Sequence, residues 1–191
     1  TQDDVQLKGW AKECRIYAED PSRGFLPSSG RIREYIEPPK NEFTRIDSGI
    51  DIGSEVSMFY DPMVAKLCSY GSTRLEAIEN MKTALSRYVI SGISHNMRFL
   101  EALLNTERYV AGDINTNFIQ EEYPDGFAGA NLTSETNMVF VAAVIFISIT
   151  EQDRASKIKD DGYHKSVEIG TRWVVNLEDK FFPVVIKSVA K

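Results

Sequence analysis

The first part of the chain alternates between apolar and polar residues in short runs, which is typical of strands that are buried on one face. In the run 12–20, Cys14 and Ile16 fall on one face of the expected strand, and Glu13 and Arg15 fall on the other. Further strands are predicted at residues 31–37, 43–50, 58–60 and 63–70.

The spacing of apolar residues changes after residue 72 to that of an amphipathic helix. Thr73-Arg74-Leu75-Glu76 is a capping-box signature, so the first helix is expected to begin there and to end near Gly92. Two more helices are predicted at 96–108 and 116–122. Tyr123-Pro124-Asp125-Gly126 then interrupts the pattern. A boundary at this point gives one domain at 1–122 and another at 123–191.

A long apolar run, from Met138 to Ile149, dominates the second domain. Its β-branched residues leave a strand open, but the run is long for one strand and Thr133 or Ser134 can cap a helix. Strands are expected after it at 167–169, 172–177 and 181–189. A helix that is apolar on every side must be surrounded, and an isolated hairpin is only marginally stable. The expected fold class is therefore α+β with antiparallel strands and packed helices, and the second domain looks truncated.

Net charge narrows the class of partner. The 191 residues carry a net charge of −6, whereas nucleic acids and anionic membranes bind clustered positive charge. The apolar run, at about a dozen residues, is shorter than the roughly 20 that a membrane span needs, and the chain does not open with a basic and apolar leader. Neither nucleic acid nor membrane is expected as a partner. Two cysteines and two histidines argue against a structural zinc site, and no metal is expected.

Candidate chemistry is sparse when only the residues are considered. Arg15 stands out, because an arginine in the middle of a strand is costly to bury unless it is paired. A structural ion pair is the favoured interpretation, and a role at a functional site stays open. Asp61 precedes Pro62 and is most simply a turn residue. Cys14 and Cys68 are interpreted as small buried apolar residues, since neither belongs to a Cys/His cluster.

Several motifs, taken in order, resemble the C-terminal lobe of biotin carboxylases. They are Glu13-Cys14-Arg15 with its flanks, Phe25-Leu26-Pro27-Ser28-Ser29-Gly30, Arg45-Ile46-Asp47-Ser48-Gly49, Tyr60-Asp61-Pro62-Met63 and Gly92-Ile93-Ser94-His95-Asn96. Tyr123-Pro124-Asp125-Gly126-Phe127 and the stretch 170–177 resemble the biotin-bearing subunit of propionyl-CoA carboxylases. The individual motifs are moderately specific, but their joint order is highly specific.

The resemblance implies a two-step chemistry, in which ATP, Mg²⁺ and bicarbonate carboxylate a ureido nitrogen of protein-bound biotin. Arg15 would hold the ureido oxygen while negative charge develops on biotin, a role that suits a fixed guanidinium. Glu13 and Asp61 would support this site, with Asp61 expected to orient Arg15. Arg45 matches an arginine at the interface between lobes in dimeric relatives, although the neighbouring residues 41–43 depart from theirs.

The resemblance also implies parts that this sequence does not contain. The family's ATP-grasp portion and its Ala-Met-Lys-Met biotin-attachment motif are not found in it. We therefore expect a fragment that is inactive alone and binds no biotin, ATP or Mg²⁺ by itself. The implied partners are the ATP-grasp portion and biotin-carrier domain of the same subunit, and a carboxyltransferase subunit. The implied location is the cytoplasm or, in a eukaryote, the mitochondrial matrix.

The second domain resembles the one that links the carboxylase and carboxyltransferase halves, a helix held within an antiparallel barrel. The connection at 151–165 would reach the partner subunit, with Lys157 and Lys159 as candidate interface residues. A disordered polar linker is the other interpretation of this stretch. The alternative for the whole chain is a non-catalytic assembly module that recruits a carboxyltransferase subunit.

Overall fold

The protein is described by a computed structural model that covers residues 1–129, 133–157, 170–177 and 180–187. The chain divides into two compact units, Thr1–Ala130 and Asn131–Lys191. Each unit is α+β with antiparallel strands, so this part of the expected fold class is confirmed.

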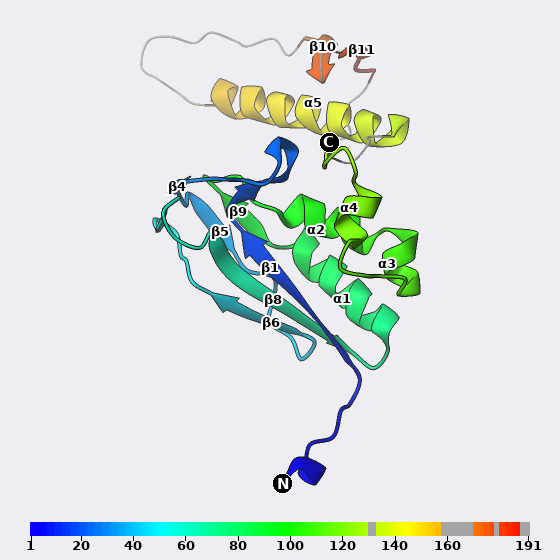
Figure 1. Ribbon diagram of the computed structural model, residues 1–191. Helices are drawn as coiled ribbons and strands as arrows, with labels where there is room; N and C mark the ends of the chain where they lie inside the picture. The colour runs from blue at the N-terminus through cyan, green and yellow to red at the C-terminus, as the bar shows by residue number, and fades with distance from the viewer. Residues whose placement is uncertain (130–132, 158–169, 178–179, 188–191) are drawn as a thin grey trace. The chain divides into compact units, whose positions relative to one another are not determined.

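A three-stranded antiparallel sheet forms the centre of the first unit. Its strand order is β1 (Trp10–Tyr17), β8 (Met63–Gly71) and β6 (Thr44–Ser48), as Figure 1 shows. The side chains alternate as the sequence predicts, because successive residues of a strand point to opposite faces. Cys14, Ile16 and Leu67 are buried on one face, while Glu13 and Arg15 lie on the other and are exposed.

Helix α1 (Arg74–Ser86) covers the apolar face of this sheet (Figure 1). The side chain of Thr73 accepts a hydrogen bond from the Glu76 amide at 3.1 Å, which confirms the capping residue expected from the sequence. Ile78 and Met81 are buried in the core. The helix ends earlier than expected because Val89–Ser91 forms strand β9, which pairs with β5 (Glu34–Ile36).

Short strand pairs complete the first unit. β2 (Glu19–Asp20) pairs with β3 (Leu26–Pro27), and β4 (Gly30–Arg31) pairs with β7 (Glu55–Val56). The 3-10 turn η1 (Gln2–Asp4) precedes β1, and η2 (Pro21–Arg23) lies between β2 and β3. The single strand predicted at 31–37 is therefore divided into β4 and β5, because the chain changes partner from β7 to β9 at this point.

The strand predicted at 58–60 is wrong. These residues form an exposed turn in which the Ser57 hydroxyl accepts a hydrogen bond from the Phe59 amide. Phe59 and Tyr60 are 86% and 82% exposed. Strand β8 begins only after Pro62, where pairing with Tyr17 becomes available at Met63.

Gly92 lies where two backbone segments come unusually close together. Its φ angle is +106°, in the region that favours glycine. A Cβ atom at this position would lie 2.1 Å from the Arg31 carbonyl oxygen. Gly92 therefore lets the chain pass directly over β4 before it reaches α2.

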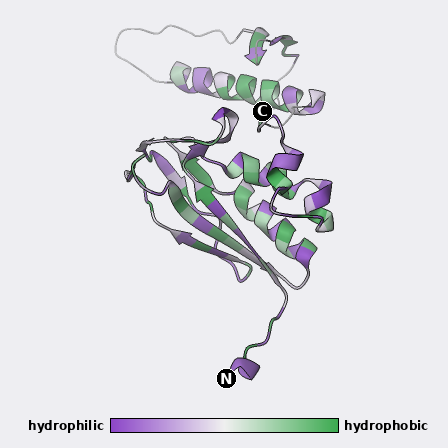
Figure 2. Ribbon diagram, viewed as in Figure 1, coloured by the Kyte–Doolittle hydropathy of each residue, from purple (hydrophilic) through white to green (hydrophobic). Residues whose placement is uncertain are grey.

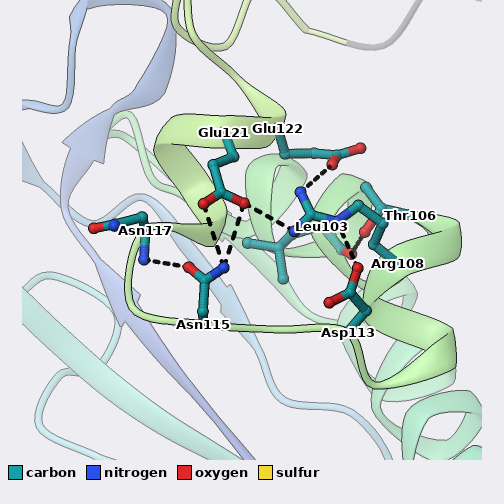
Figure 3. Close-up of polar contacts among 8 residues, drawn as sticks. All are labelled: Leu103, Thr106, Arg108, Asp113, Asn115, Asn117, Glu121 and Glu122. Atoms are coloured by element: carbon teal, nitrogen blue, oxygen red, sulfur yellow. Dashed lines mark hydrogen bonds and ion pairs between the residues drawn. The ribbon is translucent and has the colours of Figure 1, made fainter.

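The helix predicted at 96–108 is broken into α2 (Met97–Leu104) and α3 (Glu107–Ala111), and α4 (Phe118–Glu122) follows. Figure 3 shows that Arg108 of α3 reaches the carboxylates of α4. Its guanidinium lies 2.8 Å from Glu121, 3.5 Å from Glu122 and 3.2 Å from Asp113. Glu121 and Glu122 thus hold α3 and α4 together.

The first unit extends past the boundary that we expected at 122. The ring of Phe99 stacks edge-to-face with those of Tyr123 and Phe127, at centroid distances of 5.5 and 5.3 Å. Phe127 is only 8% exposed. Tyr123 and Phe127 therefore belong to the first unit, because they pack on Phe99 of α2, with Phe127 buried and Tyr123 partly buried.

The second unit contains one long helix and a hairpin. Helix α5 (Ser134–Lys157) confirms the helix predicted from residue 138 onwards, and the Thr133 hydroxyl accepts a hydrogen bond from the Thr136 amide at its start. β10 (Arg172–Leu177) pairs with β11 (Lys180–Val185). Val141 and Ile145 are buried against Val175 of the hairpin. The strand expected at 167–169 lies outside the described residues.

Most apolar side chains of α5 are exposed, including those of Met138, Val139 and Phe146. Figure 2 shows hydrophobic residues along the middle turns of this helix. With 24 residues, α5 is longer than the run of about a dozen apolar residues suggests, and by length and composition alone it could cross a membrane. Core helices of soluble proteins meet the same criterion.

Candidate functional site

The uncovered face of the three-stranded sheet gathers charged residues from all three strands. Strand register places Glu13 opposite Cys68 and Arg15 opposite Lys66, and it places Arg45 and Asp47 on the other side of the same two β8 residues. We call these six residues the open face. It holds three cations and two carboxylates, which makes it electropositive in a chain whose net charge is −6. Such a surface attracts anionic ligands.

Arg15 is held on this face by Glu13. Its Nε donates a hydrogen bond to Glu13 Oε1 at 3.0 Å, and the two side chains are 58% and 43% exposed. The hydrogen bond to Glu13 raises the pKa of Arg15, and Tyr17 adds a smaller effect in the same direction. Because this bond uses Nε, the two Nη amino groups remain as the outer donors of the guanidinium.

An exposed ion pair of this kind contributes little to the free energy of unfolding, because water screens it. A contribution to stability therefore does not explain why an arginine occupies this position. The pair instead restricts the orientation of the guanidinium, because Glu13 lies on the same strand and the same face. The geometry suits an arginine that presents its Nη groups to a ligand outside the sheet.

Asp61 makes no hydrogen bond or ion pair with Arg15 in the described structure, and its expected role in orienting Arg15 stays a prediction. Its Oδ1 accepts a hydrogen bond from the Met63 amide at 3.0 Å, so Asp61 fixes the turn that starts β8. Among the described residues, Glu13 is the carboxylate within ion-pair distance of Arg15.

The candidate interface residues lie in separate places. Arg45 pairs with Asp47 through Nε at 2.9 Å and is largely exposed on the open face. Lys157 pairs with Asp153 at 2.6 Å in the last turn of α5. Lys159 lies outside the described residues. The role of each at an interface stays a prediction.

The two cysteines are both free, but they differ in accessibility. Burial raises the pKa of the Cys14 thiol to about 12, and the nearby Cys68 adds to this. Cys68 is only partly buried, so the interpretation that it belongs to the core is wrong. Burial, followed by the charges of Glu13 and Asp47, raises its pKa as well.

Alkylation should distinguish these thiols. Because the thiolate is the reactive form, a pKa near 12 leaves about one Cys14 in 10⁴ reactive at pH 8. Iodoacetamide at pH 8 is expected to modify Cys68 in the native chain and to reach Cys14 only after denaturation. Peptide mass spectrometry would locate the adducts, and Cys68→Ser should abolish the native-state labelling. Equal labelling of both cysteines would contradict the placement of Cys14 in the core.

A cavity of about 380 Å³ lies in the first unit, but Arg15 does not line it. Its wall includes Asp20, Ser22, His95, Arg98 and Phe127. We base the candidate site on the open face and not on this cavity, because the charged groups of the sheet converge on the open face. Within the part of the chain that the structure describes, no group of three His, Cys, Asp or Glu residues is arranged to hold a metal ion.

The open face also contains residues that we did not single out from the sequence, namely Lys66 and Asp47. The alternation of residues 63–70 signals that Lys66 and Cys68 share a face. The register between β6 and β8, which brings Asp47 and Arg45 beside them, has no local signal in the sequence.

Comparison with known proteins places this geometry in a family. Residues 13–121 match the model of the biotin carboxylase C-terminal domain. The propionyl-CoA carboxylase alpha chain of Ruegeria pomeroyi is 41% identical over 98% of this chain and 30% of its own length. The human mitochondrial propionyl-CoA carboxylase alpha chain is 45% identical over 98% of this chain and 26% of its own.

A solved structure agrees with these relatives. The biotin carboxylase domain dimer of the Hydrogenobacter thermophilus 2-oxoglutarate carboxylase, in complex with MgADP, ADP and bicarbonate, superposes with a TM-score of 0.61. It is 33% identical and covers 64% of this chain and 26% of that one. The chain therefore spans less than a third of the proteins that it matches. Over the first unit, the match to the family model includes β1, β6, β8 and the helices that pack on them, and the chain belongs to the biotin carboxylase C-terminal domain family.

Proposed function

We propose that this chain supplies one wall of the active site in a biotin-dependent acyl-CoA carboxylase subunit. The complete subunit would carboxylate protein-bound biotin with ATP and bicarbonate, for transfer to propionyl-CoA or a similar acyl-CoA. The single observation that carries this proposal is the position of Arg15, which is exposed, held through Nε by Glu13, and central on an electropositive face. The similarity to propionyl-CoA carboxylase alpha chains supports the choice of acyl-CoA class.

In this function, Arg15 binds an oxygen on which negative charge develops. The Nη groups would donate hydrogen bonds to the ureido oxygen of biotin, and Glu13 would keep the guanidinium in the orientation that allows it. A donor that is fixed before the reaction stabilises such charge without having to reorient. Lys66, opposite Arg15 on β8, adds positive charge beside the same position.

Biotin, ATP and Mg²⁺ would make different demands on this chain. Biotin would contact the open face through its ureido oxygen, which the Nη groups of Arg15 fit as hydrogen-bond donors. The described residues contain no cluster suited to a metal ion, so Mg²⁺ and the nucleotide would be held mainly by the ATP-grasp portion of the same subunit. Biotin, when bound, supplies the nitrogen that accepts the carboxyl group.

The second unit would begin the barrel domain that links the subunit to its carboxyltransferase partner. The exposed apolar residues of α5 support this proposal, because a helix of this kind needs more strands around it than the β10–β11 hairpin provides. Lys157 and Lys159 would contact the partner subunit. The relatives include bacterial and mitochondrial chains, which supports a location in the cytoplasm or the mitochondrial matrix.

The isolated chain should test whether this segment acts only as part of a larger subunit. We expect the 191-residue chain to show no bicarbonate-dependent ATP hydrolysis above a buffer control, whereas the complete subunit should hydrolyse ATP under the same conditions. Phosphate release measures both. Turnover by the isolated chain would contradict the proposal, because it would require a nucleotide site within these residues.

A further inference from the structure

One residue outside the sheet, Asn96, is hydrogen-bonded to the backbone of the proposed site residue, Arg15, and of Tyr17, two residues further along β1. The Oδ1 of Asn96 accepts a hydrogen bond from the Tyr17 amide at 3.0 Å, and its Nδ2 donates to the Arg15 carbonyl at 3.1 Å. The Asn96 amide donates to the Tyr17 carbonyl at 3.2 Å. Asn96 thus occupies three backbone groups of β1 within a stretch of three residues.

These contacts fall on the outer edge of the sheet. β1 is an edge strand, and its other edge pairs with β8. The pairing with β8 shifts register between Ile16 and Tyr17, so β8 holds the strand less regularly there. Asn96 replaces the missing neighbour strand at this irregularity and fixes the backbone at Arg15.

Asn96 lies at a helix N-terminus, but its side chain does not cap that helix. It is the N-cap residue of α2, where an asparagine side chain usually accepts a hydrogen bond from its own helix. Its side chain makes no such bond and is turned toward β1 instead. The residue is only 5% exposed, and a buried amide of this kind is costly unless its groups are bonded. Both Asn96 side-chain atoms are bonded to β1.

The segment that carries Asn96 is anchored independently of Arg15. The Asn96 carbonyl accepts a hydrogen bond from the Leu100 amide at 3.0 Å, within α2. Two residues earlier, the Ser94 amide donates to the Ser28 hydroxyl at 3.0 Å. Met97 and Phe99 of α2 are buried. Because α2 is itself packed in the core, Asn96 has a fixed position and can hold the edge of β1 in place.

We infer that Asn96 is a positioning residue for Arg15, which sets the place of the guanidinium on the open face by fixing the backbone of β1. This inference rests on the proposed function, because it assigns to Asn96 an effect on the step in which Arg15 takes part. Misplacement of a binding group by about 1 Å can lower a rate by about 10²-fold.

The test uses the complete subunit and two partial reactions, biotin carboxylation and bicarbonate-dependent ATP hydrolysis measured without biotin. Asn96→Ala is expected to lower kcat for biotin carboxylation by about 10- to 100-fold. ATP hydrolysis without biotin and the KM for ATP should stay within about twofold. Asn80→Ala serves as the matched control, because Asn80 Nδ2 also donates to a strand carbonyl, that of Tyr70 at the far end of β8.

A second variant separates positioning from helix stability. Because the Asn96 side chain makes no capping bond to α2, and because aspartate is also a favourable N-cap residue, Asn96→Asp should leave α2 intact. It keeps the acceptor for the Tyr17 amide but replaces the donor to the Arg15 carbonyl with an acceptor. We expect Asn96→Asp to impair biotin carboxylation at least tenfold. Wild-type carboxylation by Asn96→Asp would overturn the inference, even if Asn96→Ala fails to fold.

A double variant distinguishes this inference from the proposed function. If Asn96 acts through Arg15, Asn96→Asp should have little further effect in an Arg15→Ala background. Additive losses, or equal losses in both partial reactions, would overturn the role of Asn96 and leave that of Arg15 intact. If Arg15→Ala alone leaves carboxylation unchanged, the proposed function is wrong, and the inference falls with it.

Discussion

Replacing Arg15 with alanine in the complete subunit is expected to lower the rate of biotin carboxylation by about 10²- to 10³-fold. Removal of one fixed donor to a developing oxyanion has an effect of this size. Bicarbonate-dependent ATP hydrolysis without biotin should persist, because the nucleotide would be bound elsewhere in the subunit. The melting temperature should hardly change, since the Arg15–Glu13 pair is exposed to water. Carboxylation of free biotin, followed with labelled bicarbonate, measures the first effect.

Two further variants make the Arg15 test specific. Arg15→Lys keeps the positive charge but loses the planar fork of donors, so we expect it to recover only part of the rate. Arg87→Ala is the control, because Arg87 is exposed at the C-cap of α1, on the helix that covers the opposite face of the sheet. A carboxylation rate near wild type in Arg15→Ala would contradict the role assigned to the open face and would favour an assembly module.

Gly92→Ala is expected to destabilise the first unit by about 3 kcal/mol or more. A side chain at φ +106° is strained, and its Cβ would lie 2.1 Å from the Arg31 carbonyl oxygen. The obstacle is backbone, which cannot move aside as the end of a flexible side chain could. Relief of the clash requires β4 or the segment before α2 to shift. Urea denaturation followed by fluorescence would measure the loss.

Gly24→Ala provides the matched control for this effect. Gly24 also has a positive φ angle, +65°, but nothing lies within 4 Å of a Cβ at that position. Its replacement should cost only the conformational strain, about 1 kcal/mol. Equal destabilisation by the two variants would show that strain alone, and not the close approach over β4, makes Gly92 necessary.

The sequence predicts the strands of the central sheet well, because their alternation follows from burial on one face. Residues 12–17 and 63–70 carry this pattern clearly, and Thr73 marks the start of α1. It predicts the segment 31–37 poorly, because the division into β4 and β5 depends on which distant strand lies beside each half. The break between α2 and α3 is also missed, although Thr106, which has an extended backbone at the break, is a residue type that favours the N-cap position.

The candidate site was predictable only in part. Alternation places Arg15 beside Glu13 on an outward face, and the ion pair between them agrees with the ion-pair interpretation. Asp61 is bonded to the turn at the start of β8, a contact that its position before Pro62 predicts, whereas its support of Arg15 stays a prediction. Asn96 gives no signal as a partner of β1, since it is 81 residues away from Arg15 and lies at the start of a helix.

The contacts of Asn96 also bear on how the sheet meets other molecules. An unpaired strand edge is a template on which another chain can add a strand and start aggregation. On β1 the Arg15 carbonyl and both backbone groups of Tyr17 are already bonded to Asn96, so an approaching strand finds them occupied. The end of β1 that carries Arg15 is thereby closed to edge-to-edge association, while the open face beside it stays accessible to a small ligand.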